Sequence, residues 1–134
     1  MIKRNNRKQE HKTGILATAR KVSEMIWQFA GEFIRSGKTL EEKQNRLNAA
    51  CSAWNMACIL PEMRNRSLNQ YIESYRSYNT DVSDEQISGV RSNMEWLIQN
   101  KLCLFPTVQK KIIDAQVTQV AGKDRINVVS ARFE

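Results

Sequence analysis

The chain has 134 residues, a length typical of one domain that builds its own hydrophobic core without disulfides or metals. Apolar residues make up 41% and charged residues 26%, which excludes a largely disordered chain, and no apolar run is long enough to cross a bilayer. The net charge is +7, and the first 38 residues hold +6 of it.

The N-terminal residues 1–12 are basic and show no apolar periodicity. They predict a flexible basic arm, followed by a single helical domain over residues 13–134. The short apolar stretch around Ile15 is interrupted by Arg20 and Lys21, so it is too brief for a secretory signal. The arm is either a solvated tail or a phosphate-binding segment.

From Thr13 to Leu104, apolar residues recur every three or four positions, which predicts a series of amphipathic helices. A first helix is expected over residues 14–36, where Ser36 and Gly37 supply a stop. Three Ser/Thr residues, each followed three positions later by Glu or Gln, predict the starts of three more helices. These capping pairs are Thr39/Glu42, Ser67/Gln70 and Ser83/Gln86.

The second helix carries two stripes. Its expected core stripe consists of Leu40, Leu47, Cys51, Trp54 and Cys58, and a flat neighbouring stripe consists of Ala49, Ala53 and Ala57. Pro61 either ends this helix or opens the next one, because proline is tolerated only in a first turn. Cys51 and Cys58 lie about 10.5 Å apart along a helix axis, which excludes a disulfide between them. The odd number of cysteines favours a reducing cytoplasm.

The helical pattern stops at the C-terminal end, where residues 110–120 and 125–133 predict two strands joined around Gly122. In the first strand, Ile113, Ala115 and Val117 are expected on one face. The fold class is therefore α+β, mainly α: about four amphipathic helices followed by a C-terminal antiparallel β-hairpin. We expect the hairpin to pack on the first and fourth helices.

The second strand is apolar on both faces, which is unusual for a strand at a sheet edge. Ile126 and Val128 share one face, whereas Val129, Ala131 and Phe133 share the other. A two-stranded ribbon also exposes two edges that can pair with another chain. The sequence therefore predicts an interaction surface for a protein partner or a homodimer. The expected partner-binding residues are Ile126, Val129, Ala131 and Phe133.

Catalytic signatures are missing from the sequence. The single histidine, His11, falls in the basic arm, where no neighbour would orient it as a base. Asp114 has no second carboxylate close in sequence to share a metal ion. Cys51 and Cys58 lack the spacing of a zinc site and fit buried thiols better. We therefore expect no enzyme, no cofactor and no small-molecule substrate.

The most specific function that these features predict is a small non-catalytic interaction or accessory subunit of a cytoplasmic assembly. Its small, basic character suits a bacterial or mobile-element protein. The alternative is nucleic-acid binding, through phosphate contacts of the arm and a segment that interleaves basic and aromatic residues. The candidate contacts are Lys3, Arg4, Arg7, Lys8 and Lys12 in the arm, and Arg64, Arg66, Tyr71, Tyr75, Arg76 and Tyr78 in that segment. Tyr71 and Tyr75 also fit the rim of a core.

Overall fold

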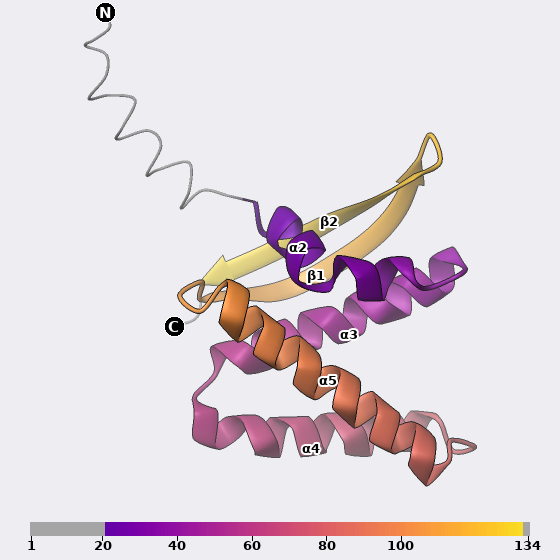
Figure 1. The fold of residues 1–134 in the computed structure, drawn as a ribbon, viewed down its shortest axis with the longest axis vertical. Coiled ribbons are helices and arrows are strands. Elements are labelled where there is room, and N and C mark those ends of the chain that lie inside the picture. Colours follow the sequence, from indigo (N-terminus) through magenta and orange to yellow (C-terminus); the bar gives the residue numbers. More distant parts are fainter. Residues whose placement is uncertain (1–20, 133–134) are drawn as a thin grey trace, which may run out of the picture.

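The computed structural model describes residues 21–132, which form four helices and one two-stranded antiparallel sheet (Figure 1). The elements are α2 (Val22–Arg35), α3 (Leu40–Cys58), α4 (Pro61–Tyr78), α5 (Asp84–Leu104), β1 (Lys110–Val120) and β2 (Lys123–Arg132). The fold is α+β and mainly α, as the sequence pattern predicts. The arm and Phe133 lie outside the described residues.

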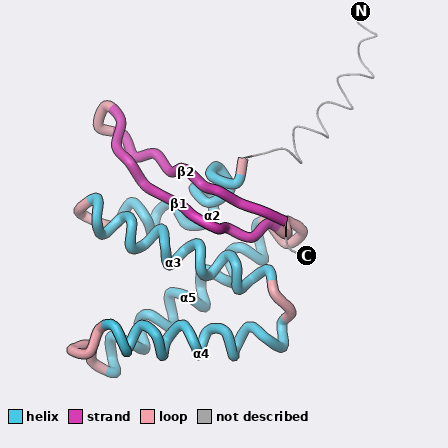
Figure 2. The backbone as a smooth tube through the Cα atoms, turned by 180° about the vertical axis from the view of Figure 1, so that it is seen from behind, coloured by secondary structure: helices cyan, strands magenta, loops and turns pink. Residues whose placement is uncertain are grey.

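Helix α3 is the central element of the fold. The hairpin lies on one side of α3 and α4 lies on the other, while α5 crosses α3 and meets α4 at an oblique angle near the loop that joins them (Figure 1). Figure 2 shows β1 between β2 and α3. The expectation that the hairpin packs on the first and fourth helices is wrong for the fourth, because β1 packs on α3 and β2 on α2. Side chains of α3 bind the backbone of β1 directly, and these bonds place the hairpin there.

The core centres on Trp54 of α3, which is fully buried. Its indole meets the ring of Phe29 edge to face, with the ring centroids 5.5 Å apart, a favoured aromatic geometry. Ala53 and Ala57 are also buried, so the flat stripe of α3 serves packing within the chain. Leu40 is 43% exposed and does not belong to the core, because the first residue of α3 lies at the outer end of the helix.

Side-chain capping sets two of the four described helix starts. The Thr39 hydroxyl accepts a hydrogen bond from the backbone N–H of Glu42 at 3.0 Å, and Ser83 with Gln86 forms a complete capping box. Pro61 opens α4 rather than closing α3. The start expected at Ser67 is wrong, because α4 begins six residues earlier at Pro61 and runs unbroken past Ser67.

The hairpin closes through a two-residue turn, Ala121-Gly122, in which both residues have positive φ, as a type I′ turn requires. Because this turn is so short, β2 begins at Lys123 rather than at Arg125. The pairing register skips one residue between Ile112 and Asp114, so Ile113 occupies a β-bulge. Ile112 is buried in its place, and Ile113 is 61% exposed rather than on the inner face with Val117.

Candidate interaction surface on the hairpin

The outer edge of β1 is closed by side chains of α3. The Asn55 side-chain amide donates to the carbonyl oxygen of Ile112 at 2.9 Å and accepts from its N–H at 2.8 Å. Gln44 repeats the arrangement, donating to the carbonyl of Ala115 at 3.0 Å and accepting from the N–H of Val117 at 2.8 Å. Both amides act as a neighbouring strand would, so this edge offers little to another chain.

The Trp54 indole adds a third bond to the same edge, donating from Nε1 to the carbonyl of Lys110 at 2.7 Å. Sequence reasoning missed Gln44 and Asn55. Their spacing of eleven residues, or three helical turns, places them on one face of α3. That spacing is the only sequence signal, and it does not reveal which element the face meets.

The outer edge of β2 is open in the described part of the chain. Ala115 and Val117 point backbone groups at α3, so they form non-hydrogen-bonded pairs with their partners Val128 and Ile126 in the ladder. In such a pair, each residue directs both its N–H and its C=O group away from the partner strand. Ile126 and Val128 therefore aim theirs away from β1, and no side chain within residues 21–132 hydrogen-bonds to these groups.

A groove of about 540 Å³ follows this open edge, between β2 and the first half of α2. Residues from both faces of β2 line it, including Ile126 on the inner face and Arg125 on the outer face, so the groove wraps the strand edge. On the helix side, the half-buried Trp27 supplies apolar surface, while Val22 is buried beneath it in the core. The Arg35 guanidinium lies 4.7 Å from the centre of the Trp27 ring, a cation–π distance.

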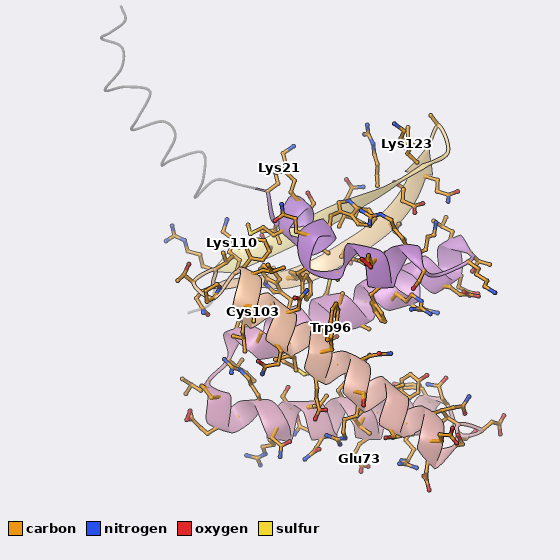
Figure 3. All side chains as sticks on the ribbon, in the orientation of Figure 1. Lys21, Glu73, Trp96, Cys103, Lys110 and Lys123 are labelled. Carbon is orange, nitrogen blue, oxygen red and sulfur yellow. The ribbon has the colours of Figure 1, made fainter. Side chains whose placement is uncertain are left out.

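The groove is positively charged. Its lining includes Lys21, Lys110 and Arg125, none of which has an ion-pair partner among the described residues. Its single acid, Asp124, is held by the Lys43 ammonium at 2.7 Å. The hydrogen bond from Lys43 is the main reason why the pKa of Asp124 lies below its usual value. Figure 3 shows Lys21 at the start of α2 and Lys110 at the start of β1.

The expected partner-binding residues fall into three groups. Val129 is 56% exposed and Ala131 is exposed on the outer face of the hairpin, where Ile113 adds a further exposed apolar side chain. The side chain of Ile126, also an expected partner-binding residue, is 7% exposed and packs into the protein's own core. It faces inward because β2 alternates, and its inner side meets the helices. Phe133 lies outside the described residues.

The basic and aromatic segment of α4 does not form one surface. Tyr71 and Tyr75 are half-buried against the core, and burial raises the pKa of Tyr71. Arg64 turns inward and donates to the carbonyl of Ala57 at 3.0 Å. Arg76 pairs with Asp84 at 3.0 Å.

Two members of this segment, Arg66 and Tyr78, remain exposed without such contacts. Helical spacing turns Tyr71 and Tyr75 towards the core, so Tyr78 is the only exposed tyrosine of the three, and nucleic-acid binding by this segment stays a prediction. The arm candidates, Lys3, Arg4, Arg7, Lys8 and Lys12, lie outside the described residues.

Cys51, Cys58 and Lys101 are partly or fully buried in the interior of the protein. Burial raises the pKa of Cys51 to about 12, which keeps this thiol protonated, and burial also raises the pKa of Cys58. Lys101 is fully buried, donates to the carbonyl of Val108 at 2.7 Å and lies 4.9 Å from the Trp54 ring centre. Burial lowers the pKa of Lys101. Sequence reasoning missed Lys101, because a lysine in a helical pattern normally indicates an exposed face.

Within residues 21–132, no three His, Cys, Asp or Glu side chains gather closely enough to hold a metal ion. None of the described helices combines the length and the apolar character that crossing a membrane requires. The chain matches no protein-family model, no curated protein and no solved structure.

Proposed function

We propose that the protein is a non-catalytic interaction subunit of a cytoplasmic assembly, and that it binds a protein partner through its C-terminal hairpin. The observation that carries this proposal is the contrast between the two hairpin edges. Helix α3 closes the edge of β1 through four hydrogen bonds between that strand and the side chains of Gln44 and Asn55, whereas the edge of β2 borders a groove. Proteins normally cover or disrupt sheet edges, so an edge left open beside a groove favours a binding role.

The outer face of the hairpin supports the same proposal. Ile113 and Val129 expose more than half of their surface, and Val129 pairs with Asp114, directly after the bulge that holds Ile113. A partner that reaches the edge of β2 would also cover these apolar side chains. Their burial would strengthen the contact by the hydrophobic effect.

Site-specific photo-crosslinking in cells tests the proposal. A photoreactive residue in place of Val129 should give a discrete adduct, which mass spectrometry identifies as a second copy or another protein. The matched control is Met63, which is 49% exposed on α4, across α3 from the hairpin (Figure 1). Adducts of equal yield at both positions, or none at Val129, would contradict a binding role for the hairpin.

Nucleic-acid binding is the alternative function, and the net charge of +7 with its concentration near the N-terminus favours it. A fluorescence-anisotropy titration of DNA and RNA oligonucleotides at two salt concentrations tests it, with and without residues 1–12. Affinity that falls steeply with salt and disappears with the arm would support this function. Anisotropy that does not change with salt, and that is the same with and without residues 1–12, would rule this function out.

A further inference from the structure

We propose that the groove beside β2 takes an extended, acidic peptide segment of another protein, which adds to the sheet as a third strand. This inference rests on the proposed function and specifies the partner's chemistry. In this mode of recognition, main-chain hydrogen bonds supply affinity, and the alternating side chains of the added strand supply specificity.

The backbone of β2 sets the first requirement for the occupant. Ile126 and Val128 each present a donor and an acceptor to the groove, so the occupant must offer acceptors and donors in alternation. A second polypeptide strand has this pattern. A nucleic-acid phosphate backbone offers acceptors alone and would leave the carbonyl groups of β2 without partners. The edge therefore favours a peptide over a polynucleotide.

The walls of the groove set the second requirement. Lys21, Lys110 and Arg125 line it without ion-pair partners in the described residues, while Lys43 neutralises its one acid. Carboxylates on the added strand would pair with these cations and steer the encounter. The half-buried ring of Trp27 suits alternate apolar side chains that point to α2.

Charge also favours an acidic segment of another protein over two other possible occupants of the groove, a second copy of the chain and the chain's own N-terminal residues. A second copy pairing through its own β2 would bring Lys123, Arg125 and Arg132 of both copies together along one seam, with Asp124 already engaged by Lys43. The chain's own residues 1–20 hold six Lys or Arg against one Glu, so they carry the same sign as the groove. Like charges disfavour both occupants, and an acidic segment of another protein fits best.

The test uses the full chain and a fluorescein-labelled octapeptide of alternating glutamate and valine. We expect saturable binding by anisotropy, which Arg125→Glu weakens at least tenfold. Arg66→Glu on α4 is the matched control, since Arg66 is exposed and lies outside the groove, and it should change the affinity less than twofold. Hydrogen exchange should slow at the N–H groups of Ile126 and Val128 when the peptide binds.

Three further peptides separate strand addition from general attraction between charges. The same octapeptide is N-methylated at every second residue, either at the odd or at the even positions. One of these two peptides should lose binding, because its methyl groups block the N–H groups that face β2, and the other should keep it. An alternating lysine-valine peptide should not bind. No binding of the glutamate peptide, equal binding of the lysine peptide, or unchanged exchange at Ile126 and Val128 would overturn the inference. If the crosslink at Val129 then persists in the Arg125→Glu variant, the hairpin still binds a partner and only the acidic strand is wrong.

Discussion

Replacing Asn55 with alanine removes both hydrogen bonds that tie the backbone of Ile112 to α3. Each bond contributes about 1 kcal/mol net, so we expect the free energy of unfolding to fall by about 2 kcal/mol relative to a matched control. For a domain of this size, that loss lowers the melting temperature by roughly 8 °C. The loss grows further if water does not reach the freed N–H and C=O groups of Ile112.

Asn45→Ala is the matched control for this prediction. Asn45 lies on the same helix, is exposed, and has no recorded hydrogen bond from its side chain within the described residues. Both substitutions gain the same helix propensity, so their difference isolates the contacts to β1. Urea denaturation followed by circular dichroism measures both variants. Equal stabilities, within about 0.5 kcal/mol, would refute the view that Asn55 anchors β1.

Three other outcomes follow from the turn, the thiols and the buried lysine. Ala121→Gly should stabilise the protein by about 1 kcal/mol, because φ is 54° at this non-glycine residue, and Gly122→Ala should destabilise it by a similar amount in the same denaturation assay. Iodoacetamide at pH 8 should modify the exposed Cys103 and leave Cys51, with its pKa of about 12, unmodified until the protein unfolds; mass mapping that finds Cys51 labelled first would contradict this. Burial lowers the pKa of Lys101 in the folded state, so unfolding takes up a proton as the pH approaches 10.5, and wild-type stability should rise there relative to Lys101→Met. A stability difference that stays constant across the alkaline range would show that Lys101 does not titrate differently on folding.

The sequence determined the features that depend on residues close together in the chain. Thr39 and Ser83 cap their helices because a hydroxyl reaches an N–H group three residues on, and no distant element is needed. Gly122 marks the turn because few other residues adopt positive φ readily. The same local logic failed at Ser67, where Pro61 had already started the helix and the capping signal had no free N–H group left to satisfy.

Only the tertiary structure decided which surfaces are covered. Strand alternation assigns Ile126 and Val129 to opposite faces, but only the position of α2 and α3 makes the face of Ile126 the buried one. The bulge at Ile113 and the closing of the β1 edge by Gln44 and Asn55 likewise depend on how the hairpin meets α3. Capping and turn preferences act over a few bonds, whereas the edge of β1 is closed by residues 57 to 73 positions away in the chain, which meet it only when the whole chain has folded.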